Sequence, residues 1–249
     1  MEQLKEDILK ILKKYSGIKG FILRDAGGIL MKVNEDEVFP AASIIKLYIL
    51  GALQNEDFST RIKLKKEDKV GGFGILQYLN DGLFLSVKDA AVFMIALSDN
   101  TATNILIDFI GLGEINRYIQ KINAKGTVLG RKMMDLQAKQ AGLENYTTPG
   151  DTLEILDILC KDSEKLEILK TQACNNKLPL FFNGAIPFAH KTGDLDGIEH
   201  DAGRMFFKDR WVDVLVFTKE LETKEDGIRI NSEIGKLVFT AFQNLGKQE

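Results

Sequence analysis

The spacing of apolar residues changes twice along this chain, and these changes limit the folds open to it. Apolar side chains recur every three or four residues over 4–15, which predicts a helix with one buried face. Residues 20–23 and 29–33 predict the two strands of a β-hairpin around the turn 25–28. Helical patterns follow over 41–50, 87–97, 102–110, 114–122 and 151–159. Strand patterns return over 188–192, 202–207 and 212–218, and a last helix carries Ile230, Ile234, Leu237, Val238, Ala241 and Phe242 on one face.

Strands at both ends with helices between them predict an α/β chain of the α+β kind, folded in two lobes. We expect an antiparallel sheet, formed by both chain ends and packed against helices, with an all-helical lobe inserted in the middle. A single domain over 1–249 is expected, with the sheet lobe at about 1–40 and 176–249 and the helical lobe at about 41–175. Residues 126–149 lack periodicity and predict a long loop, and loops of that length inside a compact domain are usually functional.

Charge and composition exclude several classes of function. A formal net charge of −3 predicts no strong field toward nucleic acid or anionic lipid, so we expect no nucleic-acid partner. No stretch approaches the roughly 18 apolar residues of a membrane span, and the first residues lack the apolar core of a secretory signal. Cys160 and Cys174 fit no metal-ligand spacing, and His190 and His200 are the only histidines, so no metal site is expected.

Ser43 and Lys46 stand three residues apart at the start of the predicted helix over 41–50, so their side chains project from the same face. A serine hydroxyl is a weak nucleophile unless a base takes its proton. A lysine can be that base when burial and nearby cations lower its pKa. The same spacing recurs at Ser16 and Lys19, between the first helix and the first strand, and we interpret that copy as a chance match.

Two further motifs give the first one its meaning. Ser98-Asp99-Asn100 lies at a break between helical patterns, where side chains can point into a cleft, and Lys191-Thr192-Gly193 ends a predicted strand. Taken singly, Ser98-Asp99-Asn100 would be interpreted as a helix cap, and Lys191-Thr192-Gly193 as the solvent-facing end of a strand. Together, in this order and in these structural contexts, the three match the S-x-x-K, S-D-N and K-T-G set.

On these motifs the chain resembles the class A β-lactamases and the related penicillin-binding serine peptidases. The likeness covers nearly the whole chain and implies a β-lactamase/transpeptidase-like fold. It extends to Phe39-Pro40-Ala41-Ala42-Ser43 at the entry to the nucleophile helix, to Leu97 through Asn104 around the second motif, to Asp68 through Leu76 before it, and to Asn145 through Pro149 at the end of the Ω-loop.

The resemblance implies a catalytic role for each matching residue. Ser43 is expected to attack a β-lactam carbonyl and form an acyl-enzyme, and Lys46 to help remove the hydroxyl proton. Ser98 is expected to relay a proton to the departing ring nitrogen. The backbone N–H groups of Ser43 and Asp194 are expected to form the oxyanion hole, which stabilises the charge that develops on the attacked carbonyl.

The resemblance also implies how a substrate is held. Asn100 is expected to hold Lys46 and to contact the amide side chain of the substrate. Lys191 and Thr192, in the motif that ends at Gly193, are expected to bind the substrate carboxylate. The partner is therefore a small β-lactam or peptidoglycan-like molecule, and we expect the protein to be a monomer.

The sequence departs from the family at the residue that releases the acyl group. Family β-lactamases use a glutamate on the Ω-loop to activate water for this step. Aligning 127–131 with the start of that loop puts Met133 where the glutamate should stand. Asp135 and Glu144 are the nearby carboxylates. Glu144 is the preferred replacement, with a structural carboxylate at the end of the loop as the alternative.

A second departure follows the K-T-G motif. The family often places an arginine on the next strand to grip the substrate carboxylate, and Arg204 is the candidate here if the strand register allows it. His200 is another candidate, although a loop histidine with a structural hydrogen bond is the more common situation. Cys160 and Cys174 do not stand where the family's disulfide would require them.

Three functions stay open on this reading. The leading one is a class A-type serine β-lactamase that needs no metal or organic cofactor. The second keeps acylation but loses efficient release, which gives a penicillin-binding D-alanyl-D-alanine peptidase-like or esterase-like protein. The third is a non-catalytic sensory or binding module on the same fold. The resemblance implies an extracytoplasmic location.

Overall fold

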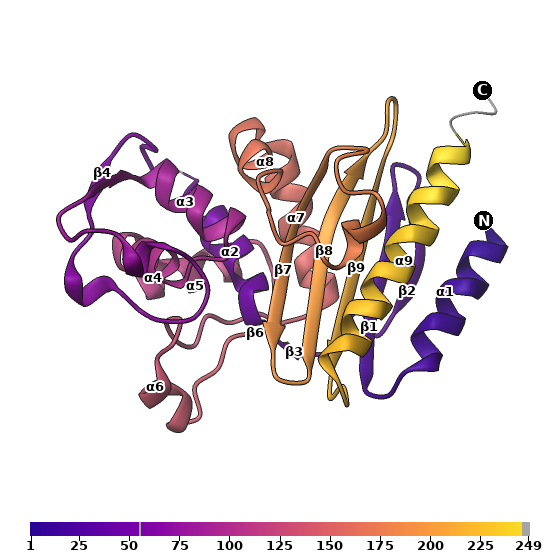
Figure 1. The fold of residues 1–249 in the computed structure, drawn as a ribbon, viewed down its shortest axis with the longest axis horizontal. Helices are drawn as coiled ribbons and strands as arrows, with labels where there is room; N and C mark the ends of the chain where they lie inside the picture. Colours follow the sequence, from indigo (N-terminus) through magenta and orange to yellow (C-terminus); the bar gives the residue numbers. More distant parts are fainter. Residues whose placement is uncertain (55, 246–249) are drawn as a thin grey trace.

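Both ends of the chain build one five-stranded antiparallel sheet, with the strand order β2-β1-β9-β8-β7 (Figure 1). The computed structural model describes residues 1–54 and 56–245, so residues 246–249 of the predicted sheet lobe and residue 55 of the predicted helical lobe lie outside the described residues. The strands are β1 (Ile18–Asp25), β2 (Gly28–Val33), β7 (Phe188–Leu195), β8 (Ile198–Phe206) and β9 (Trp211–Lys219). The predicted hairpin and the three late strands are confirmed.

Both faces of the sheet are buried. Helices α1 (Glu2–Lys14) and α9 (Lys224–Leu245) lie side by side on one face (Figure 1). Helices α7 (Pro149–Lys161) and α8 (Ser163–Leu169) pack against the other face. Successive side chains of a strand point to opposite faces. Phe21 and Leu23 of β1 accordingly join the core under α1 and α9, whereas Ile22 joins the core shared with the helical region.

The middle of the chain supplies the helical region, which lies to the left of the sheet in Figure 1. Its helices are α2 (Ile45–Ala52), α3 (Val87–Ala96), α4 (Asn100–Ile110), α5 (Leu112–Lys121) and α6 (Leu136–Gln140). Two short ladders join β3 (Phe39–Pro40) to β6 (Tyr146–Thr147) and β4 (Arg61–Lys63) to β5 (Phe84–Ser86). Single 3₁₀ turns are η1 (Ala42–Ile44), η2 (Lys66–Asp68), η3 (Leu76–Tyr78) and η4 (Leu178–Phe181).

Helix α2 lies at the centre of the helical region. All residues from Ile45 to Gly51 are buried, as expected of a helix that is apolar on every side. Lys46 is the charged exception, and its side chain is fully buried. A buried charge is costly unless it is hydrogen-bonded or neutralised, so Lys46 is the first residue whose surroundings need a functional explanation.

The predicted fold class is confirmed, with differences in detail. The predicted helix over 41–50 begins as the 3₁₀ turn η1, and α2 starts only at Ile45. The predicted loop over 126–149 contains the short helix α6 and the strand β6. Helices α7 and α8, inside the predicted helical lobe, pack on the sheet. The lobe boundaries at about residues 40 and 175 stay a prediction.

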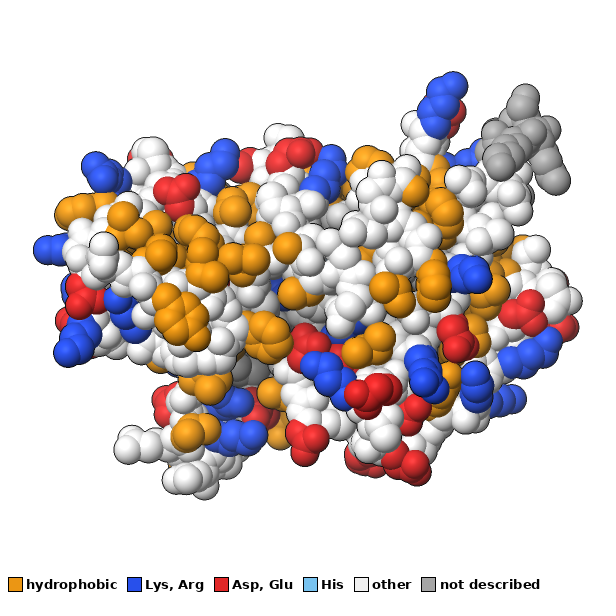
Figure 2. Space-filling model, viewed as in Figure 1, with side chains coloured by type: hydrophobic (Ala, Val, Ile, Leu, Met, Phe, Trp, Pro, Cys, Tyr) orange, Lys and Arg blue, Asp and Glu red, His pale blue; other side chains and the backbone are white. Residues whose placement is uncertain are grey.

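The visible surface carries both signs of charge. Figure 2 shows hydrophobic side chains gathered over the helical region, with lysine, arginine and acidic side chains intermixed elsewhere on this face. Across residues 1–54 and 56–245, no helix combines the length and the apolar character needed to cross a membrane.

Candidate active site

Ser43 lies in η1, the tight turn between β3 and α2, and lines a cavity of about 220 Å³. Ala41 N–H, just before the turn, donates to the Asn145 carbonyl at 2.7 Å. Ala42, the first residue of the turn, has a positive φ of 47°. A left-handed conformation at a residue other than glycine stores strain, and such strain clusters at functional sites. The backbone therefore presents Ser43 to the cavity in a fixed orientation.

Lys46 lies one turn after Ser43 and points into the same region. Its Nζ donates to the carbonyl of Ser98 at 2.6 Å, to Ser98 Oγ at 3.1 Å and to Asn100 Oδ1 at 3.1 Å. Burial, reinforced by the nearby charge of Lys191, holds the pKa of Lys46 well below its ordinary value. A lowered pKa makes the neutral amine, the form that a general base requires, easier to reach.

The second motif lies at the junction of α3 and α4. Ser98 has a positive φ of 51°, and Asp99 caps α4 by accepting from Ala102 N–H at 2.9 Å. The other Asp99 oxygen accepts from the N–H groups of Ile75 and Leu76, at 2.7 and 2.9 Å. The helix-cap interpretation of Asp99 is correct, and the cap also fixes a loop against the neighbouring Ser98.

That loop can approach because it contains glycine. Gly74 has a φ of 105°, and a Cβ there would lie 2.2 Å from the Asp99 carboxyl carbon. This position needs glycine because its φ is positive and because a side chain there would collide with Asp99 and displace the loop. Its neighbours Gly72 and Phe73 line the cavity beside Ser43.

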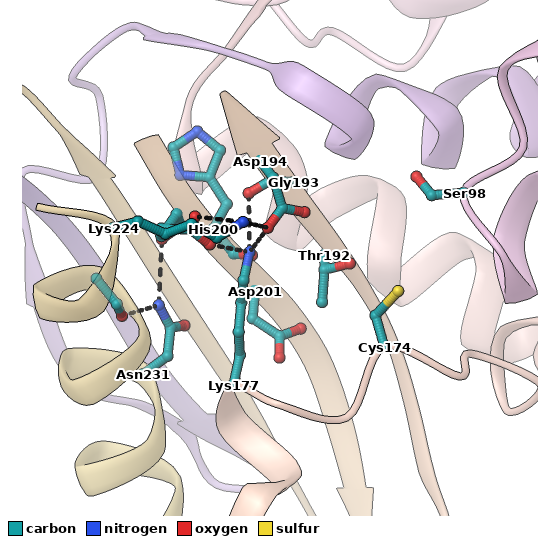
Figure 3. Close-up of polar contacts among 12 residues, drawn as sticks. Ser98, Cys174, Lys177, Thr192, Gly193, Asp194, His200, Asp201, Lys224 and Asn231 are labelled. Atoms are coloured by element: carbon teal, nitrogen blue, oxygen red, sulfur yellow. Dashed lines mark hydrogen bonds and ion pairs between the residues drawn. The ribbon is translucent and has the colours of Figure 1, made fainter. Parts of the chain in front are cut away.

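The third motif brings a second buried lysine to Ser98. Lys191 Nζ donates to Ser98 Oγ at 3.1 Å and to the Thr192 carbonyl at 2.9 Å. Burial lowers the pKa of Lys191 to about 8. Thr192 Oγ1 is buried and finds no hydrogen-bond partner among the residues that the structure describes. Figure 3 shows Thr192 on the side of β7 that faces Ser98. A buried unpaired hydroxyl of this kind is available to a ligand.

Gly193 allows β7 to pack directly on the nucleophile turn. A Cβ at Gly193 would lie 3.2 Å from Ala42 Cβ and 3.2 Å from Ile44 Cγ1. Asp194 follows at the cavity wall. The complete lining of the cavity is Ala42, Ser43, Gly72, Phe73, Asn100, Arg131, Met133, Met134, Glu144, Asn145, Asp194 and Leu195.

The carboxylates considered for the release step are both engaged elsewhere. Glu144 lies at the cavity wall, but its Oε2 accepts from Arg131 Nη2 at 3.0 Å and its Oε1 accepts from Asn145 N–H at 2.8 Å. Asp135 caps α6 and accepts from Ala138 N–H at 2.9 Å. Glu144 therefore lies near the other candidate residues, but its carboxylate forms an ion pair with Arg131. This contact fits the alternative interpretation, a structural carboxylate at the end of the loop.

Met133 lines the cavity where the family's glutamate was expected. Its backbone is held by Asn104, which accepts from Met133 N–H at 2.8 Å and donates to the Met133 carbonyl at 3.0 Å. Met133 is buried and in the same cavity as Ser43. The position is thus well ordered and apolar, and a thioether cannot act as a general base.

Arg204 does not join the other candidates. Its Nε donates to Asp213 Oδ1 at 2.7 Å and its Nη2 to Asp157 Oδ1 at 2.9 Å, while its guanidinium stacks 3.7 Å from the ring centroid of Trp211. It shares a strand face with Ala202, the residue paired with Lys191, but lies two positions further along β8. The expectation that Arg204 binds substrate has no support in this geometry, because its donors are satisfied by α7 and β9.

His200 is a buried structural histidine. Its Nε2 lies 3.0 Å from the Pro40 carbonyl, and its Nδ1 accepts from Thr218 N–H at 3.1 Å. A carbonyl can only accept, so the ring is neutral and carries its proton on Nε2. Burial lowers the pKa of His200 to about 3, in agreement with that assignment. Cys160 and Cys174 are free thiols.

Sequence reasoning missed one buried cation. Lys177 is fully buried and forms ion pairs with Asp194 and Glu199, at 2.9 and 2.7 Å. The local sequence carries no signal for this arrangement, because Lys177 stands in a turn without periodicity and its partners come from the strands β7 and β8. Across residues 1–54 and 56–245, no group of three or more His, Cys, Asp or Glu side chains could hold a metal ion.

Comparison with known proteins shows the family of the chain. Residues 3–242 match the model of the β-lactamase enzyme family, so the chain belongs to that family. No curated protein matches the chain.

Similar solved structures cover nearly the whole chain. The β-lactamase from Sphaerobacter thermophilus DSM 20745 is 27% identical, with 97% of each chain covered and a TM-score of 0.87. PBP-A is 25% identical, with 98% of this chain and 97% of that chain covered and a TM-score of 0.85. A representative class A β-lactamase from Bacteroides cellulosilyticus DSM 14838 is 21% identical, with 98% of each chain covered and a TM-score of 0.87, which supports the fold.

Proposed function

We propose that this protein is an active-site serine enzyme that opens β-lactam rings by forming an acyl-enzyme on Ser43. One observation carries the proposal: Lys46 and Lys191, both fully buried, bind the same Ser98 hydroxyl oxygen beside the cavity that Ser43 lines. Two buried lysines close to one another are costly to keep charged. A proton-transfer role around Ser98 accounts for keeping both.

The chemistry of acylation follows from these contacts. Ser43 Oγ attacks the lactam carbonyl, and Lys46, as the neutral amine, takes the hydroxyl proton. The C–N bond of the ring then breaks, and Ser98 donates its proton to the departing nitrogen while the Lys46 ammonium returns one to Ser98. The backbone N–H groups of Ser43 and Asp194 are the proposed donors to the oxyanion.

The same site offers groups that suit a β-lactam's polar substituents. Lys191 and the unpaired hydroxyl of Thr192 are proposed to bind the carboxylate, since a charged donor and a neutral donor both stabilise an anion. Asn100, which accepts from Lys46 and donates to the Gly71 carbonyl at 3.1 Å, is proposed to contact the amide side chain.

A second candidate function, acylation with slow release, is favoured by the wall opposite Ser43. Met133 is apolar, and the Glu144 carboxylate is paired with Arg131, so the cavity shows no free carboxylate among its described lining residues. Release of the acyl group needs an activated water. A solved structure of a PBP-A variant, 25% identical to this chain, is an acyl-enzyme complex with penicillin G.

The test of the proposal is covalent labelling by benzylpenicillin, followed by mass spectrometry of the intact protein. We expect one adduct per chain, located on Ser43. Its lifetime decides between the two candidates: a transient adduct with rapid product formation indicates a β-lactamase, and a persistent adduct indicates a penicillin-binding enzyme. Absence of any adduct with several β-lactams would favour the non-catalytic module.

A further inference from the structure

Lys177 binds four acceptors around one fully buried ammonium group (Figure 3). Its Nζ donates to the carbonyls of Gly193 and His200, each at 3.0 Å. It also forms ion pairs with Asp194 Oδ1 at 2.9 Å and Glu199 Oε2 at 2.7 Å. A buried lysine with this many partners is strongly constrained, because breaking any contact would leave a charge or a carbonyl unpaired.

These four partners all belong to the end of the β7–β8 ladder next to the nucleophile. Gly193 and His200 are directly paired across the two strands, as are Asp194 and Glu199. Lys177 therefore joins both strands at two successive pairs. It does so from the segment that precedes η4, outside the sheet.

Two contacts connect this ladder end to the turn that carries Ser43. Gly193 packs against that turn, with Ala41, Ala42 and Ile44 within 3.2–3.3 Å of a Cβ built on it. His200 Nε2–H donates to the Pro40 carbonyl at 3.0 Å, in the strand that enters the same turn. The distance between Asp194 and Ser43 therefore depends on where the Gly193–Asp194 segment lies against this turn. The segment supplies one of the two proposed oxyanion donors.

Two carboxyl groups, those of Asp194 and Glu199, share the buried ammonium group of Lys177. The Glu199 oxygens are buried and make no hydrogen bond within the described residues, so their ion pairs with Lys177 and Lys224 are the contacts that offset their charge. Burial, together with Asp194, raises the pKa of Glu199 to about 7. Although burial acts against it, the charge of Lys177 holds the pKa of Asp194 below its ordinary value. Of the two carboxyl groups, Glu199 is therefore the one that binds a proton more readily.

Every charged group that faces Glu199 belongs to this network. Asp194 comes from β7 and Lys177 from the segment before η4. Lys224 of α9 lies 3.6 Å from Glu199 Oε1 and is half exposed to solvent. Asn231, also on α9, donates to the Glu199 carbonyl at 3.1 Å and is uncharged. Lys224 also lies 4.0 Å from Asp194 Oδ1, the oxygen that Lys177 contacts at 2.9 Å.

We propose that Lys177 is a positioning residue for the acylation step, which holds Asp194 at the correct distance from Ser43. This inference rests on the proposed function, since it assigns the acylated serine and the oxyanion donors as above. Loss of the Glu199 proton places a second carboxylate beside Asp194, and their repulsion moves the Asp194 segment away from the nucleophile turn.

The first test compares acylation rates of three variants with the wild type, using benzylpenicillin. Lys177→Met is expected to lower the acylation rate constant by about 10²-fold, the effect of a misplacement of about 1 Å, while the half-saturating concentration changes little. Lys177→Arg is expected to restore part of the rate. Lys19→Met is the matched control. Lys19 is also buried, and it donates to the carbonyls of Ser16 and Gly17 at 2.6 and 2.9 Å. It lies in β1, which is separated from β7 by β9 and β8.

Glu199→Gln separates positioning from a merely structural role. Glutamine has nearly the same shape as glutamate and stays uncharged at every pH, so it imitates the protonated state. The ratio of wild-type to Glu199→Gln acylation rates should be constant below about pH 6 and fall above about pH 8, since Glu199 titrates near pH 7. Lys46 titrates in both proteins, so its effect cancels in the ratio. A ratio that stays constant with pH, or a folded Lys177→Met variant that acylates at the wild-type rate, would overturn the inference.

A second readout does not depend on enzyme activity. In ¹⁵N-labelled wild-type protein, the amide signals of Gly193, Asp194 and Ser43 should shift together with a midpoint near pH 7, and Glu199→Gln should abolish the shift. If the wild type forms no adduct but shows these shifts, the proposed function fails and the positioning network stands. If adducts form normally and the amide signals of Asp194 and Ser43 do not follow Glu199, the network inference fails and the proposed function stands.

Discussion

Lys46 and Lys191 bind a single oxygen atom: the Nζ of each lies 3.1 Å from Ser98 Oγ. The two lysines come from different elements, α2 and β7. Because Ser98 can donate only one proton, it can pass a proton between the two amines or to a group that enters beside it. This arrangement is the physical basis for assigning acylation chemistry to the site.

Substituting Met133 by glutamate is expected to speed release of the acyl group. The Met133 backbone is held by Asn104, so a carboxylate introduced there would face the cavity and could activate water. A general base typically contributes 10²–10⁴-fold, and we predict that Met133→Glu increases benzylpenicillin turnover by about 10²-fold. The measurement is steady-state hydrolysis together with the lifetime of the adduct.

Met134→Glu provides the control for that substitution. Met134 lines the same cavity and is 45% exposed, so its variant adds the same charge without the same placement. Equal acceleration by both variants would indicate an unspecific effect of charge. No acceleration by Met133→Glu would show that the release step is limited by something other than a missing base.

Binding of a carboxylate-bearing β-lactam should weaken at alkaline pH. A lysine is charged below its pKa, and burial lowers the pKa of Lys191 to about 8, so the positive charge is lost as the pH rises through that value. The half-saturating concentration of benzylpenicillin should rise by about tenfold between pH 7 and pH 9, an effect of about one pKa unit of interaction. The methyl ester of the same penicillin, which lacks the carboxylate, should show no such rise. Identical profiles for acid and ester would remove Lys191 from carboxylate binding.

Arg204 should matter for stability and leave substrate binding unchanged. Replacing it by methionine leaves Asp213 buried with Arg24 as its remaining partner, at 2.6 Å. Breaking a buried ion pair typically costs about 3 kcal/mol of unfolding free energy, which urea denaturation can measure. The half-saturating concentration of benzylpenicillin should equal that of the wild type. A large increase in that concentration at unchanged stability would return Arg204 to the substrate site.

Much of the site was predictable, because its residues lie in short motifs whose meaning does not depend on remote contacts. Ser43, Lys46 and Ser98 could be proposed from spacing and from their places at helix boundaries, and their catalytic roles stay a prediction. Strands at both chain ends likewise predicted a sheet built from both termini. The partners of Arg204 could not be foreseen, since they depend on the register of β8 against β9 and on where α7 crosses the sheet.

The ion pairs around the cavity show the same limit. Glu144 stands at the end of a loop, and nothing in the local sequence states that Arg131 folds back to it. Lys177 is separated in sequence from both of its acidic partners, and only the pairing of β7 with β8 brings them together. Long-range pairing of buried charges is set by tertiary packing, so local patterns predict the residues of the site better than their protonation states.

Stability should depend on pH through His200. Burial lowers its pKa to about 3, so the folded protein binds fewer protons than the unfolded chain between about pH 3 and pH 6.5. The contribution of neutral His200 is therefore fully present above pH 6.5 and is lost as the pH falls toward 3, by up to about 1.4 kcal/mol per pH unit. The difference in unfolding free energy between wild type and His200→Gln should shrink over that range. A difference that does not vary with pH would contradict the neutral assignment.

The most direct test of the central claim is mass spectrometry of the intact protein during incubation with benzylpenicillin, for the wild type, Ser43→Ala and Ser16→Ala. We expect one penicilloyl group per chain in the wild type, mapped to the peptide that contains Ser43. We also expect equal labelling of Ser16→Ala, whose serine belongs to the chance copy of the motif, and no labelling of Ser43→Ala. Labelling that survives in Ser43→Ala, or a wild-type protein that several β-lactams leave unmodified, would contradict the central claim.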